Sequence, residues 1–367
     1  MSSYVVSRED DFDFRSSEYA ELHAASEATL FQHPAWLDGV YRHRVRATDA
    51  TPLVVTVREP GAGRLVAVLP LVHRRRRGFR FVEYADLGVS DYATAVIERR
   101  SAARVLTDPT IPDAVRAVLG RYDVLDVRGL RGSDRSPALL LGAPGVRRLP
   151  YDTHPVALPP STEDWRAKLL DPSFARHLAR KRKRLRPKGR LELRTVTDAD
   201  EVRATMETIR GFRAARFADR RAVDLMQDPD CFEFYCAVAQ QGAVEGGPAR
   251  LFALTLDGAT VAATLDLVDD HEHVFLIVGY DFARLRNYSL GLLIVEELID
   301  RAVAADRHTF DLTVGDEGYK ADFGAASVPM YAVRSPASVR GHLATAAMAL
   351  HERARQAAKK WLTRPQK

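Results

Sequence analysis

The segment from Tyr280 to Phe323 constrains the fold more than any other part of the sequence. Apolar residues recur at helical spacing from Leu290 to Ala304 and predict a helix there. The loop 286–291 runs directly into this helix, whose N-terminus presents free backbone N–H groups and favours anions. Gly291 permits close approach of the backbone. The loop is therefore a candidate site for a phosphate or pyrophosphate.

The chain shows a weak internal duplication. Each half contains two strand-like stretches joined by a glycine-bearing turn, then a helix-like segment, then a strand with an aspartate, Asp126 or Asp311. The paired stretches are 52–58 with 64–72, and 251–256 with 260–268. The second pair is joined by Asp257-Gly258, a favoured hairpin turn. This pattern predicts two copies of a mixed α/β unit.

Length and composition favour a globular protein with two domains, because 367 residues with 46% hydrophobic content can build two cores. The acidic first residues differ from a secretory signal, and no apolar run is long enough to span a bilayer. We therefore expect a cytoplasmic protein without a membrane span. Cys231 and Cys236 are expected to pack as small hydrophobic residues, and no metal site is expected.

Positive charge is concentrated at Arg74–Arg77 and in the run 176–190, although the net charge is only +5. The run 176–190 predicts a basic helix, interpreted as a solvated face or, alternatively, as a docking site for the tRNA acceptor stem. The C-terminal segment 338–362 predicts a long amphipathic helix with basic flanks. It is expected to dock or oligomerise, with a membrane-surface anchor as the alternative.

The loop spacing R-x-x-S-x-G, from Arg286 to Gly291, resembles the pyrophosphate loop of the GNAT acyltransferases. Ser289 stands where that loop has its middle glycine. Further elements resemble the CelD/BcsL-type GNAT acetyltransferases, which are related in fold to the Fem-type aminoacyltransferases. These elements are Tyr288-Ser-Leu-Gly291, Phe310-Asp311, the turn 315–320 and, more weakly, 31–36, 65–71 and 90–92. Leu290 stands where this pattern usually has proline.

The resemblance implies an α/β fold with mixed sheets: tandem GNAT-like domains, each with a central, mostly antiparallel sheet flanked by helices. The expected parts are an N-terminal domain at 1–155, a C-terminal domain with the donor site at 156–337, and a basic amphipathic helix at 338–367. The donor would lie beside the strand 273–280, which precedes the loop.

The resemblance also implies roles for individual residues. Donor binding is assigned to Arg284, Arg286, Asn287, Ser289 and Gly291. Catalysis is assigned to Asp316, Tyr319, Lys320 and Tyr288. In this scheme Asp316 would orient or deprotonate the amine, a tyrosine would protonate the leaving group, and Lys320 would hold an anionic group. Acceptor binding is assigned to Asp91, Tyr92 and Tyr280. The alternative for Asp316 is a helix cap before Tyr319.

The main functional expectation is an N-acyltransferase that moves an acyl group from acyl-coenzyme A to an amine or hydroxyl of a small metabolite or glycan precursor. The alternative donor is aminoacyl-tRNA, favoured by Ser289 and the basic run 176–190. A non-enzymatic protein that binds nucleic acid or a membrane surface is the alternative from another class.

Overall fold

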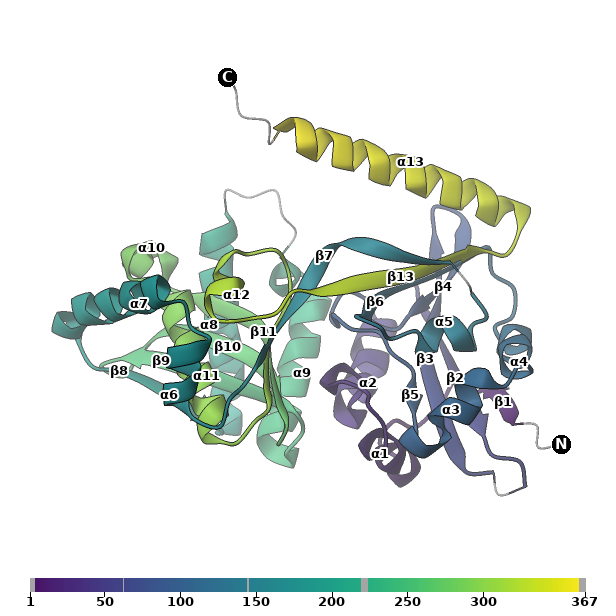
Figure 1. Cartoon of the computed structure of the whole chain (residues 1–367), viewed down its shortest axis with the longest axis horizontal. Coiled ribbons are helices and arrows are strands. Elements are labelled where there is room, and N and C mark those ends of the chain that lie inside the picture. Colours follow the sequence, from purple (N-terminus) through teal and green to yellow (C-terminus); the bar gives the residue numbers. More distant parts are fainter. Residues whose placement is uncertain (1–3, 62, 144, 219–223, 363–367) are drawn as a thin grey trace.

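One continuous mixed sheet runs through the whole molecule (Figure 1). The structure is a computed structural model that describes residues 4–61, 63–143, 145–218 and 224–362, with side chains described as far as residue 354. Within these residues the sheet has 13 strands in the order β1-β2-β3-β4-β6-β13-β7-β12-β11-β10-β9-β8, and β5 pairs with β3. The expected tandem sheets are thus joined edge to edge.

The first half of the fold is built by the segment that precedes β7. Its strands are β1 Val5–Arg8, β2 Thr51–Arg58, β3 Leu65–Arg76, β4 Phe79–Tyr84, β5 Val96–Ile97 and β6 Val124–Arg131. Its helices are α1 Ser17–Ala24, η1 Leu30–Gln32, α2 Pro34–Gly39, η2 Val40–Val45, α3 Arg99–Thr107, α4 Ile111–Val118 and α5 Ser136–Leu140. The long strand β7 Val146–Ala157 follows.

The second half repeats this plan. Its strands are β8 Leu191–Val196, β9 Ala249–Leu256, β10 Ala259–Val268, β11 Glu272–Tyr280, β12 Thr309–Val314 and β13 Val328–Pro336. Its helices are α6 Thr162–Lys168, α7 Pro172–Leu185, η3 Arg186–Lys188, α8 Ala199–Phe217, η4 Leu225–Gln227, α9 Pro229–Glu245, α10 Phe282–Leu285, η5 Arg286–Tyr288, α11 Leu290–Ala304, α12 Tyr319–Asp322 and α13 Val339–Leu362.

Strand pairing confirms the duplication predicted from the sequence. In both halves three antiparallel pairings lead to one parallel pairing, β4 with β6 and β11 with β12. The parallel pairs have matching registers, because Glu83 lies opposite Asp126 and Val274 lies opposite Asp311. The predicted hairpins are present, and Asp257 and Gly258 both adopt the positive φ that their turn requires.

The two halves exchange their last strands. β7 leaves the first half and pairs with β12, whereas β13 leaves the second half and pairs with β6. β7 and β13 also pair with each other and form the long ribbons that connect the halves (Figure 1). The predicted boundary after residue 155 falls inside β7. The strand β13, which belongs to the predicted domain 156–337, completes the sheet of the first half.

Aromatic packing between helices adds a second connection between the halves. Trp36 on α2 is fully buried, and its ring centroid lies 5.0 Å from that of Phe234 on α9. A Cβ atom at Gly39 would come within 2.8 Å of Val238, so this glycine allows α2 and α9 to approach closely. Phe31 is also fully buried and packs against Trp36, so both aromatic residues belong to the core. Cys231 and Cys236 are buried and free on α9, as predicted.

Helix α13 confirms the predicted C-terminal helix. It extends along the outside of the molecule above β13 and β4 (Figure 1). Ala344 packs against Phe81 and Val124, while Val339 and Leu350 remain 80% and 70% exposed. One side of its first turns is therefore docked on the sheet, and apolar side chains elsewhere on it face solvent.

Candidate active site

The parallel strands β11 and β12 separate soon after they begin to pair. Their register joins Glu272–Val274 to Thr309–Asp311, and the remaining residues of β11 continue without a partner in β12. A bulge next to Leu265 leaves Leu276 outside the ladder with β10, and its N–H group donates to Asp266 at 3.3 Å. Bulges bend a strand and increase its twist. The sheet therefore opens beside residues 275–280, as expected for a donor cleft.

The predicted phosphate loop closes one end of this opening. It follows β11 through α10 and η5 and enters α11 at Ser289, whose φ of 55° lies in the left-handed region. Leu292 and Leu293 donate their N–H groups to the Ser289 carbonyl. Glycine adopts this backbone conformation most easily, which explains why the family loop has glycine at this position. Ser289 takes up the same conformation at an energetic cost.

A cavity of about 260 Å³ lies at the N-terminus of α11, in the opening between the strands. Its walls combine aromatic and apolar side chains with two arginines. The lining residues are Arg216, Phe275, Val278, Tyr280, Phe282, Arg286, Ser289, Gly291, Leu292 and Tyr319. This donor cavity can take an elongated molecule with anionic groups next to the helix N-terminus.

Gly291 makes room for the ring of Tyr280. A Cβ atom at Gly291 would lie 2.7 Å from Cε1 of Tyr280, closer than real Cβ contacts. The Tyr280 ring also packs against the guanidinium of Arg216, which lies 4.9 Å from the ring centroid. The predicted acceptor residue Tyr280 therefore lies in the donor cavity, with three of the predicted donor residues.

The other two predicted donor residues lie outside this cavity. Arg284 is exposed and pairs with Asp281 at 3.2 Å. Asn287 uses its backbone carbonyl to accept a hydrogen bond from Lys181 Nζ on α7 at 2.7 Å. The basic helix α7 is thus attached to the phosphate loop, a contact that the sequence did not indicate.

The predicted catalytic residues separate into distinct environments. Tyr319 lines the donor cavity, and burial raises the pKa of its hydroxyl to about 12, helped by Glu317. Tyr288 packs on the α7 side, with the Arg184 guanidinium 5.7 Å from its ring centroid. Asp316 is exposed in the loop before α12. The cap of α12 is Gly318, without a side-chain hydrogen bond, so Asp316 does not cap this helix.

Lys320 is only 3% exposed and its ammonium is surrounded by oxygen atoms. Nζ donates to the carbonyls of Thr313, Val314 and Gly315 at 3.2, 2.8 and 3.3 Å, and it pairs with Glu317 at 3.1 Å. These partners account for all three ammonium protons. The arrangement is suited to holding the turn after β12 and leaves no free donor for an anionic substrate.

Asp91 lies in a second cavity, of about 230 Å³, between the two halves. This inter-half cavity is lined by Gly88, Val89, Asp91, Arg213, Asp224, Leu225, Met226, Tyr235, Leu276 and Ile277. Burial raises the pKa of the Asp91 carboxyl to about 7, and the negative charge of Asp311 contributes. Leu276 and Ile277 belong to the same part of β11 that borders the donor cavity on its other side. The two cavities therefore face each other across this strand.

Tyr92, the neighbouring predicted acceptor residue, is buried in a polar contact between the halves. Its hydroxyl contacts Thr153 of β7 and donates to Asp311 at 2.7 Å. Asp311 is fully buried and also pairs with Arg131 of β6 at 3.3 Å. These residues hold the halves together and line neither the donor cavity nor the inter-half cavity.

Two arginines of α8 border the cavities although they belong to none of the sequence motifs. Arg216 lines the donor cavity, and Arg213 donates to the Val278 carbonyl of β11 at 3.0 Å and pairs with Asp224 at 2.8 Å. Both residues lie near the end of α8, outside the basic run 176–190 that the sequence analysis identified. Which way their side chains point is decided by the packing of α8 on β11, which the sequence alone does not show.

Comparison with known proteins agrees with this geometry. Residues 172–321 match the model of the acetyltransferase (GNAT) domain. That range contains the donor cavity, the phosphate loop and Lys320. The second half therefore carries a GNAT acetyltransferase domain, and the protein is an enzyme of the N-acyltransferase class. The non-enzymatic alternative is set aside. No curated protein matches the sequence.

Solved structures are similar to this chain at low sequence identity, and the first two described here share its fold. The crystal structure of FemX aligns with a TM-score of 0.57 and 10% identity, covering 86% of this chain and 94% of that chain. A conserved protein of unknown function from Bacteroides thetaiotaomicron VPI-5482 aligns with a TM-score of 0.55 and 13% identity, covering 90% and 99%. A tandem GNAT protein from the clavulanic acid biosynthesis pathway aligns at 0.47 and 13%, covering 92% and 99%.

Two further observations concern the described part of the chain alone. None of its helices combines the length and the apolar character needed to cross a membrane. Its histidine, cysteine and acidic side chains form no group of three or more that could hold a metal ion.

Proposed function

We propose that this enzyme transfers an acyl group from acyl-coenzyme A to an amine, or a hydroxyl, of a small metabolite or glycan precursor. The donor cavity carries the proposal, because it combines a helix N-terminus, two arginines and an apolar wall along an unpaired strand. Coenzyme A has the matching chemistry: anionic phosphates at one end and a flexible, largely uncharged arm at the other. In this proposal the phosphates lie at Leu290 and Gly291, with Arg216 and Arg286 beside them.

The proposed acceptor approaches from the inter-half cavity. Its amine nitrogen attacks the thioester carbonyl carbon, so that a C–N bond forms and the C–S bond breaks. The proton lost by the amine passes to the Asp91 carboxylate, and the departing thiolate takes the hydroxyl proton of Tyr319. A pKa of about 7 suits Asp91 for accepting a proton near neutral pH, and a pKa of about 12 keeps Tyr319 protonated until the thiolate forms.

A thermal-shift titration with coenzyme A, acetyl-coenzyme A and aminoacylated tRNA tests the donor. Coenzyme A and its acetyl thioester are expected to raise the melting temperature of the wild type, because a ligand that binds only the native state stabilises it. The absence of any shift with either compound would reject the proposed donor.

The alternative donor is aminoacyl-tRNA, and the attachment of α7 to the loop favours it. Exposed basic side chains continue along α7 next to Asn287, where a nucleic acid phosphate backbone would find partners. A triple variant, Arg176→Glu, Arg180→Glu and Lys183→Glu, tests this because it spares Lys181 and Arg184, which contact the loop.

If α7 is a solvated face, this variant should retain wild-type turnover with acyl-coenzyme A. If α7 docks tRNA, gel-shift titrations at two salt concentrations should show weaker binding and a flatter salt dependence, by about 0.9 in the log–log slope per lost phosphate contact. If the wild type binds tRNA tightly and in a salt-sensitive way, and the variant loses this binding, aminoacyl-tRNA would replace coenzyme A as the proposed donor.

A further inference from the structure

A third cavity, of about 310 Å³, lies at the opening between β4 and β6 in the first half. This charged cavity is lined by Arg74, Arg76, Glu83, Tyr84, Asp86, Leu87, Gly88, Asp126 and Arg128. Because β4 and β6 correspond to β11 and β12, it occupies the place in the first half that the donor cavity occupies in the second. Its walls are charged where those of the donor cavity are mainly apolar, so the two take different ligands.

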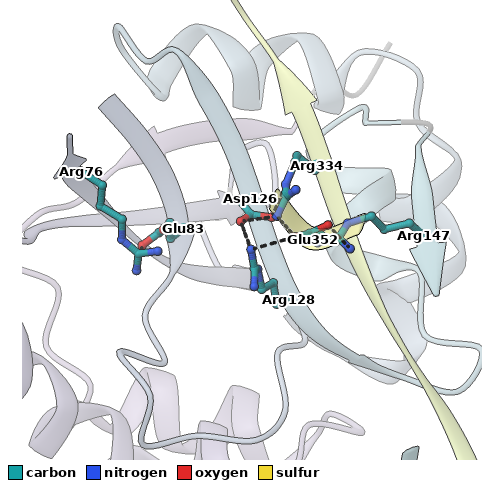
Figure 2. A network of polar contacts seen from close by, with 7 residues as sticks. All are labelled: Arg76, Glu83, Asp126, Arg128, Arg147, Arg334 and Glu352. Carbon is teal, nitrogen blue, oxygen red and sulfur yellow. Dashed lines mark hydrogen bonds and ion pairs between the residues drawn. The ribbon is translucent and has the colours of Figure 1, made fainter. Parts of the chain in front are cut away.

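The basic side of the charged cavity has unused hydrogen-bond donors. Arg76 pairs through Nη2 with Glu83 at 2.9 Å, and Arg128 donates Nε and Nη2 to Asp126 (Figure 2). A guanidinium has five N–H donors, so these described contacts leave donors on both arginines. Their side chains are 46% and 43% exposed, which gives an incoming acid group access to them.

The negative charge of Asp126 is balanced by two arginines of the protein, so we do not assign this residue to ligand binding. It accepts hydrogen bonds from Arg128 and from Arg334 of the exchanged strand β13. Arg334 also pairs with Glu352 of α13 at 3.2 Å. In Figure 2, Arg334 and Glu352 lie on the opposite side of Asp126 from Arg76 and Glu83. Asp126 thus fixes the position of Arg128 at the cavity wall.

The acidic side consists of Glu83 and Asp86. Burial raises the pKa of the Glu83 carboxyl to about 7. The charges of Asp126 and Asp86 add to this rise, whereas Arg76 and Arg74 on β3 oppose it. Burial likewise raises the pKa of Asp86 to about 6. The N–H group of Gly88 and the charges of Arg76 and Arg128 oppose this rise, whereas the charge of Asp126 adds to it. An ammonium group in the cavity would restore the charged form of both carboxyls.

The charged cavity adjoins the inter-half cavity, because Gly88 lines both. The segment 83–91 therefore places Glu83 and Asp86 in one cavity and Asp91 in the next. To take part in the proposed acyl transfer, a ligand in the charged cavity must reach past Gly88 toward Asp91.

We infer that the charged cavity is the specificity site for the acceptor, and that the acceptor carries both an ammonium and an acid group, as an amino acid or short peptide does. Arg76 and Arg128 bind the acid group, and Glu83 and Asp86 bind the ammonium. The reacting amine is a second nitrogen, which reaches Asp91. This inference rests on the proposed acyl transfer and names the substrate class for it.

Binding to the protein without donor tests the site directly. Glycylglycine is the probe, and saturation-transfer NMR and thermal shift compare it with glycinamide, which lacks the acid, and N-acetylglycine, which lacks the ammonium. Glycylglycine is expected to bind at least tenfold more tightly than either, because each analogue loses a charge-assisted contact. Its affinity should rise between pH 5 and pH 7, because the acidic side chains ionise while the ammonium of the probe stays protonated. Equal or absent binding of all three would overturn the inference.

Two variants and a matched control locate the probe. Glu83→Gln and Asp86→Asn keep the size of each side chain and should each weaken glycylglycine binding about tenfold. Glu192→Gln is the control, because Glu192 also pairs with an arginine, Arg190 at 2.8 Å, but lies on β8. Equal effects of all three substitutions would show binding elsewhere and overturn the inference.

Failure of this inference can be told apart from failure of the proposed function. If coenzyme A binds and lysine-containing dipeptides are acylated with wild-type rates in Glu83→Gln, the acyl transfer stands and the specificity site is wrong. If coenzyme A fails to bind while glycylglycine binding depends on Glu83, the charged cavity stands as a ligand site but the acyl transfer is wrong.

Discussion

The two halves of the sheet share one strand plan but differ at the point where their parallel strands separate. In the second half Val274 lies opposite Asp311, and the opening leads along aromatic and apolar side chains to a helix N-terminus. In the first half Glu83 lies opposite Asp126, and the opening is lined by arginines and carboxyls. The same backbone therefore serves an elongated donor in one copy and a compact charged ligand in the other.

The aspartates Asp126 and Asp311 show what the copies retain. Each is buried at the same position of its strand, and each contacts the strand that has crossed over from the other half. Asp126 binds Arg334 of β13, and Asp311 lies 3.4 Å from the Thr153 hydroxyl of β7. These aspartates therefore stabilise the exchanged strands, whereas ligand chemistry is set by the residues around them.

Replacement of Asp91 should have the largest effect, because this first-half residue is the proposed base for a reaction whose donor is bound by the second half. Asp91→Asn is expected to lower kcat by about 10²- to 10⁴-fold, as for loss of a positioned base, with little change in donor affinity. In the wild type the rate should rise with pH through about 7, because the base acts when ionised, and the variant should lose this rise. Steady-state kinetics from pH 5 to 9 measure both.

Asp316→Asn is the comparison variant for that experiment. The sequence motif predicts a catalytic role for Asp316, yet the residue is exposed in the structure. If Asp316→Asn lowered kcat and Asp91→Asn did not, the base would belong to the second half alone, and the proposed catalytic role of the first half would be rejected.

Removal of the two aspartates should destabilise the protein unequally. Asp311→Ala leaves Arg131 without its buried partner and takes one of two partners from the Tyr92 hydroxyl, at a cost of about 3 to 5 kcal/mol. Asp126→Ala should cost less, because Arg334 keeps its contact with Glu352. Urea denaturation measures both values. The opposite order would show that the crossing of β13 depends more on its aspartate than the crossing of β7 does.

Enlargement of Gly291 should impair the donor cavity alone. Valine at this position would push its Cβ atom into the Tyr280 ring, and we expect at least a tenfold loss of coenzyme A affinity, about 1.4 kcal/mol. Gly211→Val on α8 is the control, because no atom lies within 4 Å of a Cβ built there. Calorimetric titration of both folded variants with coenzyme A measures this difference. Equal affinities would reject the assignment of the donor phosphates to this loop.

Replacement of Ser289 by glycine should have the smallest effect and the opposite sign. Ser289→Gly relieves the left-handed strain and is expected to stabilise the protein by about 1 kcal/mol, with donor binding unchanged or tighter. Thermal denaturation with and without coenzyme A measures this. A loss of stability would show that the serine hydroxyl has a role that glycine cannot replace.

Local parts of the fold could be predicted because they depend on neighbouring residues. The periodic apolar residues from Leu290 to Ala304 predicted α11 at its observed bounds, and Asp257-Gly258 predicted a hairpin. The motif also located Arg286, Ser289 and Gly291 at one cavity. These features follow from helical periodicity, from turn conformation and from the short distance between loop and helix.

The remaining features depend on contacts between distant segments. Nothing in residues 146–157 or 328–336 shows which half each strand joins, since pairing is decided by the assembled sheet. The burial of Lys320 follows from the left-handed backbone at Thr313, which turns three successive carbonyls toward the ammonium. Asp91 becomes a candidate base only when β11 and the loop after β4 meet across the two halves.

The strand exchange also affects how the chain can be synthesised. During translation β6 emerges with one open edge, and its permanent neighbour β13 emerges only after the whole second half has been made. The nascent first half must protect this edge, or leave it unpaired, until that late strand arrives. Because α13 directly follows β13, the next helix to emerge covers the junction as soon as the late strand is in place.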